Sequence, residues 1–182
     1  MDQQPICVDV VISATQFRSF SLFDTFRRQR RWTRLALFAG ILCAFGAVCF
    51  LKEGGAFLGL LLILIGLGLP AVYLFTFLSG VRNQGRIYRL GNGRSLYRVE
   101  LTPAEDGIRA LAAEGEPSVF RWADCPEAYR VDGFIYLYVS TGRALFLPAA
   151  YITGATPDAL WAMMTEKLPA GKAKDLRKQA SV

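Results

Sequence analysis

The chain has 182 residues, of which 53% are hydrophobic and 20% charged, and its formal net charge is +6. Soluble domains usually carry about 25% charged residues, so this composition favours a membrane protein. The sequence contains no histidine, which removes the commonest general base and the commonest metal ligand.

The positive charge is concentrated in three short segments. Residues 1–34 have a net charge of +3, residues 82–94 carry four arginines and no acid, and residues 169–182 are again +3. The largest polar region, residues 95–168, carries ten acidic and six basic residues. Because a nucleic-acid-binding module usually concentrates positive charge on its folded part, we expect no nucleic-acid partner.

The N-terminal segment, residues 1–34, is expected to contain a strand followed by a basic amphipathic helix. The stretch ICVDVVIS, residues 6–13, is typical of a strand. Residues 15–34 favour a helix that carries Phe17, Phe20, Phe23 and Phe26 toward the following apolar run. Neither piece makes a domain alone, so we expect the strand to join a sheet formed later in the chain.

Two apolar runs follow. Residues 35–51 contain seventeen residues without a charge, and residues 54–81 contain twenty-eight. A membrane-spanning helix needs about 20 apolar residues, so we predict transmembrane helices over 35–51 and 56–81, joined by an external turn at 52–55. Two buried helices of a soluble core, or a cleaved signal peptide, explain these lengths and their position less well.

Arginines flank this hairpin on one side only, which predicts its orientation. Positive residues near span ends stay in the cytoplasm, so both termini are expected there, in the inner or plasma membrane of a bacterium. Trp32 suits the interfacial aromatic belt, and the arginines are expected to contact anionic lipid headgroups. The residues predicted to lie at the membrane surface are Arg27, Arg28, Arg30, Arg31, Trp32, Arg34, Arg82, Arg86 and Arg89.

Small residues recur within the spans and predict close helix packing. Packing within the hairpin is the preferred interpretation, with self-association of two copies as the alternative. Proline in the second span is expected to kink it near two glycines. No Asp, Glu, Lys, Arg or His lies in either span, which argues against transport by this chain alone. The predicted packing residues are Ala39, Gly40, Cys43, Ala44, Ala47, Gly66, Gly68 and Pro70.

After a basic linker, residues 82–94, the hydrophobic pattern becomes alternating. Residues 95–168 predict five or six short antiparallel strands, with FIYLYVS (134–140) the strongest. Thr156 and Pro157 predict the start of a C-terminal helix. Residues 169–182 are expected to be a disordered basic tail. The predicted core residues of this domain are Trp122, Phe134, Tyr136, Tyr138, Phe146, Pro148 and Trp161.

These elements together predict a membrane α+β protein: a two-helix transmembrane hairpin inserted into a small antiparallel β domain, cytoplasmic and PH-like (pleckstrin-homology-like), with a C-terminal helix. Residues 120–152, FRWADCPEAYRVDGFIYLYVSTGRALFLPAAYI, resemble the C-terminal domain of the bacterial YcxB-like membrane proteins. The matching positions are Trp122, 134–139, 144–148 and Tyr151, whereas Cys125 and Ala149 depart from the family pattern. The resemblance implies a membrane-anchored module and carries no catalytic residue to transfer.

Nothing in the sequence points to catalysis. The serines have no histidine to serve as base, the paired carboxylates fall in turns, and the four cysteines form no C-x-x-C motif. We therefore expect no enzyme, no cofactor and no metal, but a binding or scaffold module with an unknown partner protein. The alternative is an accessory or regulatory subunit of a membrane transporter or envelope enzyme complex.

Overall fold

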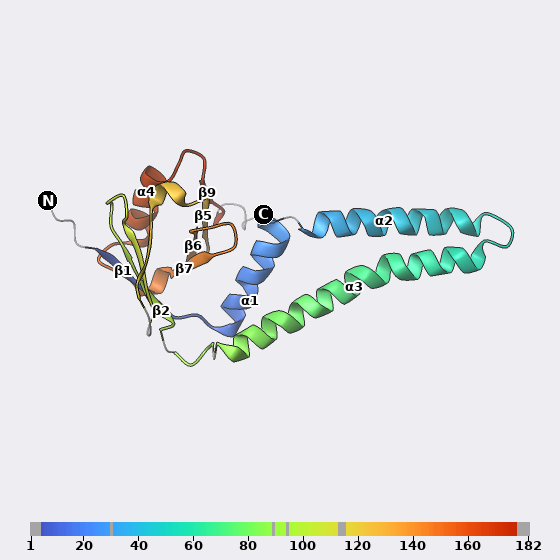
Figure 1. Cartoon of the computed structure of the whole chain (residues 1–182), viewed down its shortest axis with the longest axis horizontal. Coiled ribbons are helices and arrows are strands. Elements are labelled where there is room, and N and C mark those ends of the chain that lie inside the picture. Colours follow the sequence, from blue (N-terminus) through green and yellow to red (C-terminus); the bar gives the residue numbers. More distant parts are fainter. Residues whose placement is uncertain (1–4, 30, 89, 94, 113–115, 178–182) are drawn as a thin grey trace. The chain divides into compact units, whose positions relative to one another are not determined.

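The computed structural model describes residues 5–29, 31–88, 90–93, 95–112 and 116–177 (Figure 1). The chain divides into two compact units, which are described separately. The β unit contains Met1–Ile12 and Gly93–Val182, and the helical unit contains Ser13–Asn92. The prediction of an α+β protein with two long apolar helices and antiparallel sheets is confirmed.

The first sheet of the β unit has five strands in the order β4-β3-β2-β1-β8, all antiparallel to their neighbours. Alternate residues of the three longest strands point into the core, as the period of two in the sequence requires. The strands are β1 (Ile6–Val10), β2 (Tyr97–Leu101), β3 (Ile108–Ala112), β4 (Ser118–Phe120) and β8 (Ile152–Thr153).

Strand β1 lies inside this sheet although it precedes the helical unit in the chain. It pairs with β2 on one side, where Val8 stands opposite Val99, and with β8 on the other. On the outer face, the Arg98 guanidinium forms an ion pair with Asp9 at 2.8 Å. The sheet therefore needs chain from both sides of the helical unit.

The second sheet has four strands in the order β7-β6-β5-β9. Four consecutive residues are buried in both β6 and β7. Since neighbouring residues of a strand point to opposite faces, protein covers both faces of this sheet. The strands are β5 (Glu127–Val131), β6 (Phe134–Tyr138), β7 (Ala144–Pro148) and β9 (Ala173–Asp175), and short 3₁₀ turns occupy Trp122–Asp124 and Ala149–Tyr151.

Helix α4 (Pro157–Lys167) begins as predicted, with the Thr156 hydroxyl accepting a hydrogen bond from the backbone N–H of Ala159. It buries Leu160 and Met164. The helix is also tied to the second sheet, because the buried guanidinium of Arg130 on β5 pairs with Asp158 in the first turn of α4.

The prediction of a disordered tail from residue 169 is wrong for its first part. Strand β9 pairs with β5 in parallel, with Ala173 opposite Ala128, and the backbone N–H of Leu176 donates to the carbonyl of Arg130 at 2.8 Å. Arg177 and Asp175 form an ion pair at 2.8 Å just beyond the strand. Ala173, Lys174 and Asp175 carry no strand signal, so the element depends on pairing with the free edge of β5. Residues 178–182 lie outside the described part.

The helical unit opens with α1 (Ala14–Leu22) and a π-helix, η1 (Phe23–Arg28). A capping box starts α1, since Ser13 and Gln16 exchange side-chain-to-backbone hydrogen bonds. The predicted continuous helix over 15–34 is instead interrupted at Gln29. Its backbone N–H donates to the carbonyl of Asp24 at 2.9 Å, a π-type bond, and the Asp24 carboxylate accepts from the Arg28 side chain.

Helices α2 (Arg31–Phe50) and α3 (Ala56–Ile87) form an antiparallel hairpin (Figure 1). The chain reverses where Gly54 adopts a left-handed φ of 77°, a conformation that favours glycine. Both helices extend beyond the predicted spans: α2 starts four residues earlier, and α3 passes through Pro70 and continues six residues past Val81. Hydropathy detects the apolar part alone, whereas backbone hydrogen bonding carries the helix on into polar sequence.

Both helices of the hairpin are long and apolar enough to cross a membrane, with mean hydropathies of 1.9 for Trp32–Phe50 and 2.5 for Ala56–Ile87. Protein buries only 6% of the first apolar window and 11% of the second. The core helices of a soluble protein would be mostly buried, so this low burial disfavours the interpretation as two helices of a soluble core.

Candidate functional site

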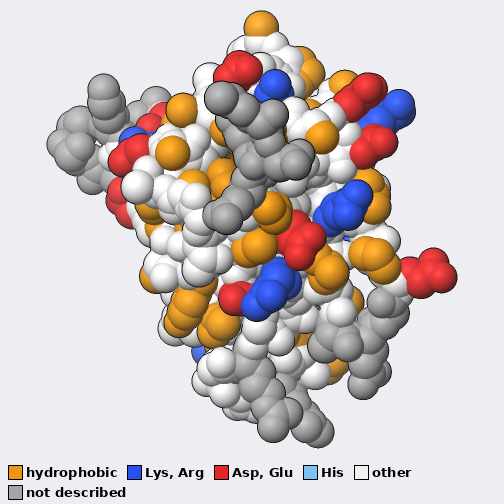
Figure 2. Space-filling view, turned by 90° about the vertical axis from the view of Figure 1, so that its left-hand side faces the viewer, with side chains coloured by type: hydrophobic (Ala, Val, Ile, Leu, Met, Phe, Trp, Pro, Cys, Tyr) orange, Lys and Arg blue, Asp and Glu red, His pale blue; other side chains and the backbone are white. Residues whose placement is uncertain are grey.

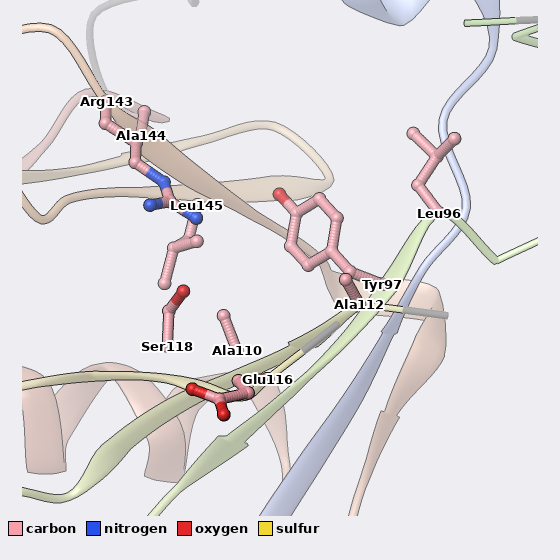
Figure 3. A pocket seen from close by; sticks show the side chains of 9 residues that line it. All are labelled: Leu96, Tyr97, Ala110, Ala112, Glu116, Ser118, Arg143, Ala144 and Leu145. Carbon is pink, nitrogen blue, oxygen red and sulfur yellow. The ribbon is translucent and has the colours of Figure 1, made fainter. Parts of the chain in front are cut away.

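A pocket of about 180 Å³ opens in the β unit between the two sheets (Figure 3). One side comes from β2, β3 and β4 of the first sheet, and the other from the start of β7 in the second sheet. The lining residues are Leu96, Tyr97, Ala110, Ala112, Glu116, Ser118, Arg143, Ala144 and Leu145.

The pocket exists because its walls carry small side chains where two sheet edges meet. β4 ends the first sheet and β7 ends the second, so no strand ladder closes this side of the unit. Ala110, Ala112 and Ala144 line the cavity and leave space that larger residues would fill. Concave sites lined by apolar side chains and a few polar groups are common places for small ligands.

Tyr97 forms the back of the pocket and connects the sheets. Its hydroxyl oxygen accepts a hydrogen bond from the backbone N–H of Phe146 at 3.1 Å, so the hydroxyl proton is available to an acceptor in the cavity. Burial raises the pKa of Tyr97 to about 12, because the phenolate would lose its hydration. The group is therefore a neutral donor at physiological pH.

Two opposite charges line the same cavity. The Arg143 guanidinium lies 5.2 Å from the ring centre of Phe120, a cation–π contact that orients it. Glu116 lies at the edge of the pocket, and the polar ends of Arg143, Ser118 and Tyr97 point into the space between the sheets (Figure 3). Within the described ranges, neither Arg143 nor Glu116 forms an ion pair.

The sequence analysis proposed none of these pocket residues as a site. In the sequence, Tyr97 opens an alternating apolar pattern and Arg143 follows Thr141-Gly142, and neither position carries a local signal for a site. Only the fold brings them together, because 46 positions separate them: Tyr97 begins β2 of the first sheet, and Arg143 directly precedes β7 of the second.

The residues predicted for the membrane surface gather at the open end of the hairpin. The ring centre of Phe26 lies 5.6 Å from that of Trp32 and 5.8 Å from that of Phe77 on α3. Arg27, Arg34, Arg82 and Arg86 are exposed, whereas Arg28 pairs with Asp24 at 3.1 Å. Arg31 begins α2, and Arg30 and Arg89 lie outside the described residues.

The hairpin interface uses some of the predicted small residues and two unpredicted ones. A Cβ added to Gly66 would lie 3.0 Å from Cys43 Sγ and 3.1 Å from the carbonyl oxygen of Ala39. Gly46 and Gly59, which the prediction missed, face each other so closely that either added Cβ would lie within 2.8 Å of the other residue's carbonyl oxygen.

Four predicted packing residues point elsewhere. Gly40 and Gly68 have open space where a Cβ would be, and Ala44 and Ala47 are exposed. A spacing of four places residues on one helix face, but it does not say which face of α2 contacts α3. Pro70 lies inside α3 without ending it.

Five of the seven predicted core residues are buried: Trp122, Tyr136, Tyr138, Phe146 and Pro148. Trp122 also donates its indole N–H to the carbonyl of Thr102 at 2.9 Å. Phe134 and Trp161 are only half-buried. Phe134 begins β6 directly after the turn at Asp132 and Gly133, and the ring of Trp161 lies 6.0 Å from the guanidinium of Arg130.

The described residues contain no group of three or more Cys, Asp or Glu side chains that could hold a metal ion. Cys125 is buried, and burial together with Asp124 raises its pKa to about 11, so it is a neutral thiol at physiological pH. On the face of the β unit in Figure 2, acidic and basic side chains are interspersed.

Comparison with known proteins adds no relative. No family model matches the sequence. Neither the curated proteins nor the solved structures include a match.

Proposed function

We propose that the protein is a membrane-anchored binding or scaffold module on the cytoplasmic face of a bacterial inner membrane, and that it acts without catalysis. In this proposal the hairpin α2–α3 spans the bilayer and the β unit binds a partner. The YcxB-like resemblance and a PH-like β unit belong to the same proposal.

The pairing of β1 with β2 is the observation that supports it most. These strands flank the helical unit in sequence, and Val8 stands opposite Val99 in one sheet. One folded sheet cannot lie on two sides of a membrane, so the two chain ends of the hairpin must share a side. This requirement suits an even number of spans, and the arginines of that end favour the cytoplasm.

The aromatic cluster at the open end of the hairpin supports an interfacial position. Phe26, Trp32 and Phe77 are in contact there, and amphipathic rings settle at headgroup level. The exposed arginines 27, 34, 82 and 86 surround this level. Each basic residue near an anionic surface contributes about 1 kcal/mol, so anionic lipids are the proposed headgroup partners.

Cysteine labelling in intact cells tests the topology. A membrane-impermeant maleimide should label Glu53→Cys, which lies in the turn between the helices, and should spare Arg109→Cys, which is exposed on β3. Unmodified protein reports labelling of the native cysteines. Labelling of Arg109→Cys alone would reverse the orientation, and labelling of neither would contradict a spanning hairpin.

One observation favours the second candidate, an accessory or regulatory subunit of a membrane transporter or envelope enzyme complex. Gly40, Ala44 and Ala47 face away from α3 and are exposed, and small residues allow close helix approach in membranes. A crosslink from Ala44→Cys to a second membrane protein would favour this candidate over the scaffold. Ala39→Cys is the matched control, because Ala39 faces Gly66 inside the hairpin.

A further inference from the structure

We propose that the pocket between the sheets binds a small zwitterion of the α-amino acid class with a compact apolar side chain. The inference names a ligand for the binding module and rests on that function. It is independent of the orientation of the hairpin.

Two opposite charges border the pocket. Arg143 and Glu116 border one cavity, yet they form no ion pair with each other or with another described residue. Both side chains are exposed and solvated, so neither requires a partner, but a ligand with both charges gains a contact with each of them. A ligand that carries both charges bridges the gap between them.

The pocket also offers several hydrogen-bond donors that suit a carboxylate. The hydroxyls of Tyr97 on β2 and Ser118 on β4 point into the cavity, and the guanidinium of Arg143 enters it from the loop before β7 (Figure 3). A carboxylate accepts several hydrogen bonds at once, and a guanidinium can bind it through two parallel ones. Tyr97 suits this role, because Phe146 already donates to its oxygen and leaves its proton to be donated.

The volume and the apolar lining of the pocket limit the size and type of the ligand's side chain. The cavity of about 180 Å³ is slightly larger than a cavity of about 150 Å³ that holds benzene. Leu96, Leu145 and three alanines provide its apolar surface. A branched aliphatic side chain fits this volume and surface, whereas a nucleotide or a sugar phosphate is too large.

Calorimetric titration of the full-length protein in lipid nanodiscs tests the proposal, with L-leucine as the probe. Leucinamide lacks the carboxylate, and 4-methylpentanoate lacks the ammonium group. L-leucine should bind, and each analogue should bind at least tenfold more weakly, since each leaves one lining charge without its partner. Absence of leucine binding, or equal binding of the analogues, overturns the proposal.

Variants test the assignment of each charge. Arg143→Gln should weaken leucine at least tenfold and leave leucinamide unchanged, and Glu116→Gln should weaken leucine and leave 4-methylpentanoate unchanged. Arg109→Gln, exposed on β3 outside the pocket, is the matched control. Thermal unfolding checks that each variant folds. If a variant does not fold, the titrations of the unmodified protein with leucine and its two analogues still test the proposal. A negative result here leaves the labelling pattern of the hairpin intact, so the two proposals fail separately.

Discussion

The hydroxyl oxygen of Tyr97 accepts a hydrogen bond from the backbone N–H of Phe146 at 3.1 Å. Tyr97 begins β2 in the first sheet, and Phe146 lies in β7 at the edge of the second. An edge strand has no ladder partner on its outer side, so the tyrosine replaces one. This single bond joins the sheets at the wall of the pocket.

Replacing Tyr97 with phenylalanine should therefore destabilise the β unit. Tyr97→Phe leaves the buried N–H of Phe146 without an acceptor, which costs about 1–3 kcal/mol. Thermal unfolding of the purified protein in detergent measures the change. Tyr151→Phe, at a residue 45% exposed, should have little effect. Equal stability of Tyr97→Phe and the unmodified protein would contradict the role of the bond.

Stability should fall at alkaline pH, and Tyr97 should contribute to the fall. Burial raises the pKa of Tyr97 and of Tyr136 from 10.0 to about 12. Above the unfolded pKa, the unfolded chain binds fewer protons than the folded one, so unfolding becomes easier as pH rises from about 10 through 12. The unfolding midpoint of Tyr97→Phe should drop less across this range than that of the unmodified protein. Parallel curves would show that Tyr97 titrates normally.

The sheet should not form without β1. Val8 is fully buried between β2 and β8, so Val8→Asp places an unpaired charge in the core and should cost at least about 3 kcal/mol. Asp9→Ala on the same strand removes only an exposed ion pair with Arg98, worth about 1 kcal/mol or less. Limited proteolysis of residues 95–177 compares the two. Similar resistance in both variants would place β1 outside the core.

The hairpin should tolerate bulk at one glycine of α3 and resist it at another. A Cβ at Gly59 would meet the carbonyl oxygen of Gly46 at 2.7 Å, whereas Gly68 has open space. Gly59→Val should force the helices apart at a cost of about 1–3 kcal/mol, and Gly68→Val should be nearly neutral. Unfolding with increasing amounts of a denaturing detergent measures the stability of both variants. A reversed order would mean that α3 presents a different face to α2.

The elements with strong local signals are those that sequence reasoning located well. The apolar runs of α2 and α3 need no knowledge of neighbours, and the caps of α4 at Thr156 and Pro157 act within one turn. The alternation of Tyr97, Val99 and Leu101 likewise predicts β2. Prediction failed where the local signal is absent. The three residues of β9 have no strand pattern, and Gln29 interrupts a helix through contacts with Asp24.

By itself the sequence determined which segments are apolar enough to leave water and which face of an alternating strand such as β2 points inward, because hydrophobicity and its period belong to the residues alone. Only the tertiary structure decided which glycines, Gly46 and Gly59 among them, lie between the helices. It also decided that Tyr97, Arg143 and Glu116 share one cavity. Such partnerships depend on the register and crossing of distant elements, and these are set by packing of the whole unit rather than by any local pattern.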